Sequence, residues 1–522
     1  MESINTEVDL EHEPPPAIEL RDVSKTFGNV QANKNISMKI EKGSIHGIVG
    51  ENGAGKSTLM NILYGLHTAD TGDILVNGQK TNIRSSADSI ALGIGMVHPH
   101  FMLIPNFSVL ENVMVGNEGG FLLGGGEEEA IRTLKHLGTE YGMDVDPHAR
   151  IEDLPVGIRQ RVEIIKAIKS GAEILILDEP TGVLTPQEAE GLFTILRVLR
   201  DRGVSVLLIT HKLAEIMAIT DAVSVIRDGE IVGHRKTSDT TTEELAELMV
   251  GREVSLQVER GASEAGETRL SVSNLGHSSP SGIKKLSGIT FDLHAGEILG
   301  VAGVAGNGQT ELLEILSGMR VPDEGKFSVL GTEVTPNKHS NPKLMRKLGI
   351  GHIPEDRHLH GLVLDFEAQE NFVFGFHDAD QFYSGSLLNQ RFITDHSSDL
   401  MGKFDVRPTN PKTKAKNFSG GNQQKIVIAR EINEVPKLLI IGQPTRGVDI
   451  GAIEFIHKQI IYLRDQGCAI LLVSVELEEI LGLSDRIMVM NAGEQMGILD
   501  RDEADERTLG LMMAGITGSN AA

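Results

Sequence analysis

The sequence is poor in residues that define several protein classes. Cys468 is the only cysteine among 522 residues, so internal disulfides and a four-cysteine zinc site are excluded, and a reducing compartment fits best. Tryptophan is absent and there are only 4 tyrosines, which argues against an aromatic platform that stacks nucleic-acid bases.

Long apolar runs are also missing. A membrane-spanning helix needs roughly 18 apolar residues, whereas the runs Val204–Ile209 and Ala469–Val473 have the length of strands. The acidic, proline-containing N-terminal segment has neither a basic start nor an apolar run, so no secretory signal is expected. We therefore expect a chain without a membrane span of its own.

The charge balance is strongly acidic. The 73 acidic and 49 basic side chains give a formal net charge of −24. Proteins that bind duplex DNA, RNA or anionic lipid need a basic face, so we expect no nucleic acid and no direct lipid partner. The length is sufficient for two or three domains.

The two halves of the sequence resemble each other. Gly47–Leu59 matches Gly300–Leu312 at an offset of 253 residues, the distance from Lys56 to Gln309. Ile174–Thr181 matches Leu438–Thr445 at an offset of 264, and two further motifs share that offset. A duplication with 11 extra residues inserted in the second half explains both offsets.

The repeat predicts the domain organisation. Residues 1–15 are expected to be a tail, 16–257 the first domain, 258–268 a linker rich in Gly, Ala, Ser and Glu, and 269–522 the second domain. Within each half, short apolar runs such as Ile45–Val49 and Ile298–Val301 follow glycine turns and precede segments of helical period. This alternation predicts an α/β fold with a parallel sheet covered by helices.

One glycine-rich segment carries the pattern of a phosphate-binding loop. Gly50-x-x-x-x-Gly55-Lys56-Ser57 lies between a predicted strand and a predicted helix. Glycines let backbone amides turn toward a phosphate, Lys56 can reach the β- and γ-phosphates, and the Ser57 hydroxyl is a ligand for Mg²⁺. A purely structural glycine turn is the alternative.

Polar residues follow two further buried strands. Asp178 and Glu179 come directly after Ile174–Leu177, where phosphoryl-transfer sites hold an acid for Mg²⁺ and a residue that activates water. We assign Asp178 to the metal and Glu179 to general base. His211 follows Val206–Ile209 and can hydrogen-bond the γ-phosphate. A solvated strand end and a structural histidine are the alternatives.

These motifs, together with Phe418-Ser-Gly-Gly-Asn-Gln-Gln, resemble those of ATP-binding cassette (ABC) proteins over about Ile18 to Gly515. The tandem form resembles the ATPases of bacterial simple-sugar and nucleoside importers. Gly303–Leu312, Gly351–His358 and Gly361–Asp365 look most like the nucleoside branch. The resemblance implies two tandem P-loop NTPase domains, each with a helical subdomain and an antiparallel β part, that use ATP and Mg²⁺.

In that family each ATP lies between the phosphate loop of one domain and the signature segment of the other. The resemblance therefore implies two unequal sites. The first contains the phosphate-loop residues, the acids, the histidine and the signature residues of the second half: Gly50, Asn52, Gly53, Gly55, Lys56, Ser57, Thr58, Asp178, Glu179, His211, Ser419, Gly420, Gly421 and Asn422.

The second site is expected to be degenerate. Gln309 replaces the lysine, Gly442 the metal-linked aspartate, Gln443 the base and Val475 the histidine. On the signature side, Pro155 lacks both the serine hydroxyl and a backbone donor, and Val156 adds bulk. We predict one hydrolytic site and one site that binds nucleotide weakly or holds the domains together.

Two further features match the family and one departs from it. Phe27 matches the residue whose ring stacks on adenine in the family, with a position in the hydrophobic core as the alternative. In the second half of the sequence, Leu275 stands at the position that corresponds to Phe27. Pro99 stands where the family has a glutamine that links the magnesium site to the membrane partner. An apolar stretch beside Pro99 matches the docking groove for permease helices, and core packing is the alternative. The stretch consists of Phe101, Met102, Leu103, Ile104, Phe107 and Val109.

The predicted function is the ATP-hydrolysing, energy-coupling subunit of a bacterial importer for nucleosides or simple sugars. Its expected partners are two transmembrane permease subunits and, indirectly, a substrate-binding lipoprotein, which would place the chain at the cytoplasmic face of the membrane. One alternative is a tandem ABC protein of translation or DNA repair, although these relatives carry two intact sites. Another is a binding module without turnover, which Pro99 and Pro155 would favour.

Overall fold

The computed structural model describes residues 15–98, 102–115, 124–182, 184, 186–253, 260–261, 265–304, 306–338, 340–384, 386–448 and 450–516. The chain divides into two compact units, Met1–Glu253 (unit 1) and Val254–Ala522 (unit 2). Of the expected linker 258–268, residues 258–259 and 262–264 lie outside the described residues, and its last residue, Thr268, begins the first strand of unit 2.

Unit 1 contains two sheets. The antiparallel sheet has the order β2-β1-β4-β5, with the strands β1 (Ile18–Phe27), β2 (Val30–Ile40), β4 (Thr71–Val76) and β5 (Gln79–Thr81). The second sheet has the order β10-β9-β3-β8-β7-β6, with the strands β3 (Ile45–Val49), β6 (Ile94–Val97), β7 (Ile174–Asp178), β8 (Ser205–Ile209), β9 (Ala222–Arg227) and β10 (Glu230–Lys236).

In the second sheet β3, β6, β7, β8 and β9 are parallel, and β10 pairs antiparallel with β9. All residues of β3, β7 and β8 are buried, as expected for strands covered on both faces. The carboxyl ends of these three strands carry the phosphate loop, Asp178–Glu179 and His211.

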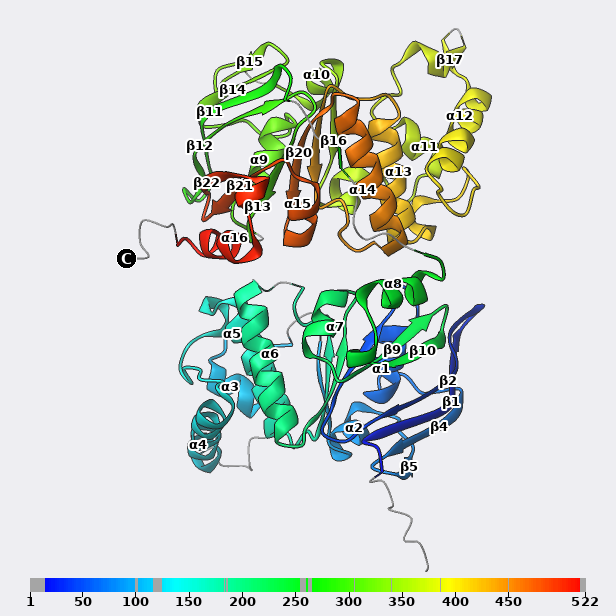
Figure 1. Ribbon diagram of the computed structural model, residues 1–522, viewed down its shortest axis with the longest axis vertical. Helices are drawn as coiled ribbons and strands as arrows, with labels where there is room; N and C mark the ends of the chain where they lie inside the picture. The colour runs from blue at the N-terminus through cyan, green and yellow to red at the C-terminus, as the bar shows by residue number, and fades with distance from the viewer. Residues whose placement is uncertain are drawn as a thin grey trace, which may run out of the picture. The chain divides into compact units, whose positions relative to one another are not determined.

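The helices of unit 1 are α1 (Lys56–Leu63), α2 (Ser86–Ala91), α3 (Val109–Met114), α4 (Gly124–Tyr141), α5 (Val156–Lys169), α6 (Pro186–Asp201), α7 (Leu213–Ile219) and α8 (Thr242–Val250). Helices α3, α4 and α5 form the helical subdomain, which in Figure 1 lies on the side of unit 1 away from β1, β2, β4 and β5.

Unit 2 repeats this plan with its two sheets joined. The order is β15-β14-β11-β12-β22-β21-β13-β20-β19-β16, and a single parallel bridge, Ser287 to Glu494, joins the antiparallel part to the rest. The strands are β11 (Thr268–Ser278), β12 (Lys284–His294), β13 (Ile298–Ala302), β14 (Glu324–Val329), β15 (Thr332–Val334), β16 (Ile350–Ile353), β19 (Leu438–Gly442), β20 (Ala469–Ser474), β21 (Arg486–Asn491) and β22 (Glu494–Asp500).

The helices of unit 2 are α9 (Gln309–Leu316), α10 (Pro342–Lys347), α11 (Ala368–Val373), α12 (Gln390–Lys403), α13 (Gly420–Ile432), α14 (Ile450–Asp465), α15 (Leu477–Leu483) and α16 (Glu506–Met513). A short hairpin of β17 (Tyr383–Ser384) and β18 (Leu387–Leu388) lies between α11 and α12. In Figure 1, α11, α12 and α13 lie on the side of unit 2 away from β11, β12, β14 and β15.

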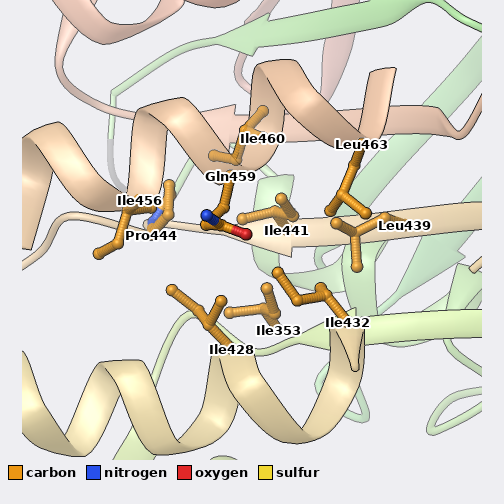
Figure 2. Close-up of a pocket in the computed structure, with 10 residues that line it drawn as sticks. All are labelled: Ile353, Ile428, Ile432, Leu439, Ile441, Pro444, Ile456, Gln459, Ile460 and Leu463. Carbon is orange, nitrogen blue, oxygen red and sulfur yellow. The ribbon is translucent and has the colours of Figure 1, made fainter. Parts of the chain in front are cut away.

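The core of unit 2 contains a small apolar cavity between helices α13 and α14 and strand β19. Figure 2 shows Ile428 and Ile432 of α13 on one side of Ile441, and Ile456 and Ile460 of α14 on the other. The cavity has a volume of about 10 Å³, and Gln459 is the one polar side chain that lines it. This volume is about that of one water-sized sphere, so the cavity is a packing void and not a nucleotide site.

None of the helices in the described part of the chain combines the length and the apolar character that crossing a bilayer requires.

Candidate functional site

The phosphate loop of unit 1 connects β3 to α1. Gly53 and Gly55 have φ values of 86° and 103°, in the left-handed region that glycine adopts without strain. A Cβ atom at Gly55 would lie 2.2 Å from the carbonyl oxygen of Ala32, so a side chain is excluded there. The Asn33 side chain also donates a hydrogen bond to the Gly55 carbonyl, at 3.1 Å. These contacts fix the path of the loop into α1.

Lys56 begins α1 and is buried beneath the loop. Its Nζ donates to the carbonyl oxygens of Gly50, at 2.6 Å, and Glu51, at 3.0 Å. Burial lowers the pKa of the Lys56 ammonium, while the carboxylates of Glu179 and Asp178 oppose the shift. A buried cation held only by carbonyls and nearby acids is suited to bind an anion such as a phosphate.

Asp178 is the last residue of β7, and its side chain is hydrogen-bonded to Ser57. Burial is the main cause that raises the pKa of Asp178, and the Glu179 charge adds to it, while Lys56 and Ser57 act in the opposite direction. Carboxylate and hydroxyl oxygens are the ligands that Mg²⁺ prefers. The residues present therefore fit a Mg²⁺ ion that is bound with a nucleotide.

Glu179 follows β7 in an unusual backbone conformation. Its φ is 46°, and its amide donates to the Ile209 carbonyl of β8 at 2.8 Å. Nδ1 of His211 lies 2.9 Å from Oε1 of Glu179, and the imidazole donates because an ionised carboxylate can only accept. This hydrogen bond is the main cause that lowers the pKa of Glu179, against burial. The carboxylate is therefore ionised and held in place, as a general base requires.

These residues line an open cleft. Lys56, Ser57, Asp178 and Glu179 contribute to its lining, together with residues of the β2 edge and of the β9–β10 turn; its volume is about 790 Å³. Of the predicted site residues of unit 1, Asn52, Gly53, Gly55 and Thr58 also line it. The structure thus brings together side chains from the ends of β3 and β7.

Phe27 lies at the end of β1 and is not a core residue. It is 43% exposed, with the His67 ring edge-on at a centroid distance of 5.1 Å and the Lys25 ammonium 5.4 Å from its centroid. The core alternative is therefore wrong for Phe27. Its counterpart Leu275 is fully buried.

The predicted docking stretch has a mixed environment. Met102 is 61% exposed and Ile104 is 36% exposed, whereas Leu103 and Val109 belong to the buried core. Pro99 and Phe101 lie outside the described residues. Neither docking nor core packing describes the whole stretch.

The signature segment of unit 2 begins helix α13. Ser419 is the N-cap residue, and its Oγ accepts a hydrogen bond from the Asn422 amide at 3.4 Å and from the Asn422 side chain at 2.8 Å. Gly420 and Gly421 form the first turn. In unit 1, Pro155 precedes α5 without a side-chain cap. Pairing of Ser419–Asn422 with the loop of unit 1 stays a prediction.

Unit 2 has the same backbone conformation at this position as unit 1, but a glutamine stands in place of the carboxylate. Gln443 has a φ of 48°, and its amide donates to the Val473 carbonyl at 2.8 Å, as Glu179 does to Ile209. The Gln443 carboxamide oxygen accepts from the Val475 amide at 3.3 Å. A glutamine in this position cannot accept a proton from water as a carboxylate can.

Sequence reasoning missed several residues around the site. The Glu215 carboxylate accepts hydrogen bonds from Thr181, after β7, and from Thr210, after β8, so it joins the two loops that carry Glu179 and His211. Gln160 of α5 donates to the Pro180 carbonyl at 2.7 Å. In unit 2, Thr310 is bonded to Glu355. Glu355 lies within Gly351–His358, a segment that the sequence analysis noted without assigning a role to this residue.

Comparison with known proteins identifies the family. The profile of the family described as ABC transporter matches residues 33–182 and 286–446. The chain is 44% identical to the nucleoside import ATP-binding protein NupA of Lactococcus lactis subsp. cremoris (strain MG1363), over 95% of this chain and 98% of that protein. It is also 44% identical to the guanosine import ATP-binding protein NupO of Bacillus subtilis (strain 168), over 97% and 98%.

A further relative is the ribose import ATP-binding protein RbsA of Bacillus cereus (strain ATCC 14579), at 37% identity over 95% of this chain and 99% of that protein. Among solved structures, that of archaeal ribosome recycling factor aABCE1 with stalk protein aP1 matches with a TM-score of 0.61 and 19% identity, covering 92% of this chain and 90% of that one. The likeness to the aABCE1 structure shows the fold alone.

The chain is thus a protein with two tandem ABC ATPase domains. It belongs to the ABC transporter family. Membership confirms the predicted family, the fold class, an ATPase coupled to transport, and ATP with Mg²⁺ as the cofactors. The alternative of a translation or DNA-repair protein is not favoured, because the relatives at 36–44% identity are import ATP-binding proteins.

Proposed function

We propose that this chain is the ATP-hydrolysing subunit of a bacterial importer for nucleosides, with one hydrolytic site and one degenerate site. The observation that carries the proposal is the Glu179–His211 pair beside Lys56 in unit 1, where unit 2 has Gln443, Val475 and Gln309. The two 44% identical relatives, named for nucleoside and guanosine import, support the nucleoside class.

In the proposed first site, the loop amides and Lys56 hold the phosphates of ATP, and Ser57 and Asp178 hold the Mg²⁺ ion, which neutralises phosphate charge when bound. Glu179 takes a proton from the attacking water, and His211 keeps its carboxylate oriented. Ser419 and the amides of Gly420, Gly421 and Asn422 would complete the site as donors to the γ-phosphate. Phe27 would stack on the adenine ring.

The partners follow from the same proposal. We expect two permease subunits at the membrane and, through them, a substrate-binding lipoprotein, with this chain peripheral at the cytoplasmic face. Closure of the two domains on ATP would be converted by the permeases into alternating access. The solute itself would contact the permeases and the lipoprotein.

A reconstituted complex tests the function. The chain is placed in proteoliposomes with its permease subunits, and ATP hydrolysis is measured with the lipoprotein loaded with guanosine, ribose or glucose. Stimulation by guanosine alone supports the nucleoside proposal. Stimulation by ribose or glucose alone supports sugar import, which the 37% identical ribose relative makes the second candidate. An unchanged rate with each solute would contradict both.

A further inference from the structure

One carboxylate connects the two loops that carry the Glu179–His211 pair. Glu215, the third residue of α7, accepts a hydrogen bond from the Thr181 hydroxyl through Oε1 and, at 3.1 Å, from the Thr210 hydroxyl through Oε2. Thr181 is two residues after Glu179, and Thr210 directly precedes His211. Each oxygen of the Glu215 carboxylate therefore holds one of the two loops.

Both threonine hydroxyls are buried donors. Thr181 is 4% exposed and Thr210 is 2% exposed, so solvent does not offer an alternative acceptor. A buried donor that loses its acceptor is costly, and a hydrogen bond to an ionised group is stronger than one between neutral groups. Without Glu215, the two loops would have to move for these hydroxyls to find other acceptors.

Helix α7 holds Glu215 in place by packing on the sheet. Gly47 of β3 has no side chain, which lets Ile216 approach: a Cβ built on Gly47 would lie 2.6 Å from Cδ1 of Ile216. Beyond the end of α7, the Asp221 carboxylate accepts a hydrogen bond from the Ile45 amide of β3 at 2.8 Å. The carboxylate is therefore supplied by a helix that has its own contacts with the sheet, separate from the two loops.

Unit 2 has a glutamate at the same position with a different partner. Glu479 is the third residue of α15, and its Oε1 lies 2.9 Å from Nε2 of His457 on α14. Its Oε2 has no hydrogen-bond partner within the part of the chain that the structure describes. In unit 1 the residue equivalent to His457 is Phe193, whose ring has no hydrogen-bond donor to offer the carboxylate.

The two units therefore differ in whether a carboxylate joins these loops. The equivalents of the two threonines are Thr445 and Ser474, and among the described residues neither of them donates to Glu479. The connection is present in the unit that has a carboxylate and a histidine to hold together. It is not formed in the unit that has Gln443 and Val475 in their places.

We propose that Glu215 is a positioning residue for ATP hydrolysis at the first site, which holds the Glu179 carboxylate and the His211 ring at the separation that the reaction needs. The inference rests on the proposed role of Glu179 as the general base. Glu215 acts through the two threonines and not on the nucleotide itself. Because an error of about 1 Å in placement can cost about 100-fold in rate, Glu215 should affect kcat more than the affinity for ATP.

The first test separates rate from affinity. In the complex assembled with its permease subunits, Glu215→Ala should lower kcat about 10–100-fold, while the affinity of the full chain for a non-hydrolysable ATP analogue should change by less than about twofold in equilibrium dialysis. Glu479→Ala, which removes the equivalent carboxylate of unit 2, is the matched control and should retain most of the activity. An unchanged kcat in Glu215→Ala, equal losses in the two variants, or a loss confined to analogue binding would overturn the proposal.

A double-mutant cycle tests whether Glu215 acts through His211. Substitutions at independent sites have additive effects on the activation free energy, whereas residues that act as one unit do not. In the His211→Ala background, Glu215→Ala should lower kcat by less than about threefold, because the histidine that it positions is already absent. Additive losses would show that Glu215 acts independently of the histidine, and would overturn the proposal.

Variants of Thr181 provide a second route if Glu215→Ala does not fold. Thr181→Val keeps the size of the side chain and removes the hydroxyl, so kcat should fall about tenfold, whereas Thr181→Ser keeps the hydroxyl and should retain most of the activity. Thr445→Val, at the equivalent position of unit 2, is the control. Equal rates in the valine and serine variants of Thr181 would exclude the hydrogen bond to Glu215 as the cause, and would overturn the proposal.

Glu179→Gln distinguishes a failure of this inference from a failure of the proposed function. If half of the ATPase activity survives in Glu179→Gln, the assignment of the base is wrong and the inference falls with it. If Glu179→Gln stops turnover while Glu215→Ala and Thr181→Val leave kcat unchanged, the proposed first site stands and only the positioning role is overturned.

Discussion

Nδ1 of His211 lies 2.9 Å from Oε1 of Glu179, although the two residues follow different strands, β8 and β7. The pair depends on the parallel pairing of these strands, in which Asp178 lies opposite Ile209. It also depends on the amide of Glu179, which donates back to Ile209. The hydrogen-bonded backbone therefore sets the distance between the Glu179 carboxylate and the His211 ring.

Replacing Glu179, the proposed general base, should stop turnover. In Glu179→Gln the side chain keeps its size and loses the group that accepts a proton, so we expect the ATPase rate of the assembled complex to fall on the order of 10²–10⁴-fold. The matched control is Gln443→Asn in unit 2, at the same backbone conformation, which should retain most of the activity. Survival of half of the activity in Glu179→Gln would show that the second site also hydrolyses ATP.

Removing the histidine should change the pH profile as well as the rate. The bond from His211 lowers the pKa of Glu179, so in His211→Ala that pKa rises and the carboxylate becomes protonated at a higher pH. The acidic limb of the pH profile of kcat should therefore move to higher pH. Steady-state ATPase rates between pH 5 and 8 measure this shift. His136→Ala, which removes an exposed pair with Glu140, is the control. A lower ATPase rate without a shift of the acidic limb would indicate that His211 acts only by contacting the phosphate.

Phe27 should contribute affinity rather than stability. Base stacking on an aromatic ring is worth about 1–3 kcal/mol, so Phe27→Ala should weaken ATP binding to unit 1 about 5–150-fold. Because the ring is 43% exposed, the thermal midpoint should change little. Phe27→Trp should retain the affinity for ATP, because it keeps an aromatic ring. Fluorescence titration measures the dissociation constant of each variant. An unchanged dissociation constant in Phe27→Ala would exclude the stacking role.

Ser419 is expected to act on ATP beyond capping its helix. Losing an N-cap costs about 1 kcal/mol of stability, which Ser419→Ala should show in thermal unfolding together with a large loss of ATPase activity. Asn341 caps α10 in the same unit, accepting from the Leu344 amide at 2.9 Å, and Asn341→Ala should lose similar stability with little loss of activity. Equal ATPase rates in the two variants would make Ser419 a structural cap only.

A buried histidine should make unit 1 sensitive to acid. His46 in β3 bonds to Ser224 at 2.6 Å, and burial, with a smaller effect of His234, lowers its pKa to about 4 from 6.5. Since the unfolded chain binds the proton more readily, stability is full above pH 6.5 and falls as the pH drops toward 4, by on the order of 3 kcal/mol.

Urea unfolding followed at pH 7 and at pH 4.5 measures this effect. His46→Gln should reduce the difference between the two pH values, because the substituted side chain does not titrate. An unreduced difference would assign the acid sensitivity to other groups, such as His352 in unit 2, whose pKa burial also lowers to about 4.

The sequence indicated most of the first site because its residues follow one another closely. Gly50–Ser57 is contiguous, and Asp178 and Glu179 adjoin a run whose buried strand character was evident. The strand Ile45–Val49 was predicted with its observed bounds. Contacts between residues far apart in the sequence were not predictable in the same way. Glu215 accepts hydrogen bonds from the loops after β7 and β8, and Asn33 of β2 donates a hydrogen bond to the phosphate loop.

The sequence by itself determined the duplication, the family and the residue types at each phosphate loop, because these depend on the order of residues along the chain. Only the tertiary structure decided that Phe27 is exposed, that His211 contacts Glu179, and that Glu355 stands beside Thr310. The physical reason is that strand order, which no local pattern encodes, determines which strand ends lie together.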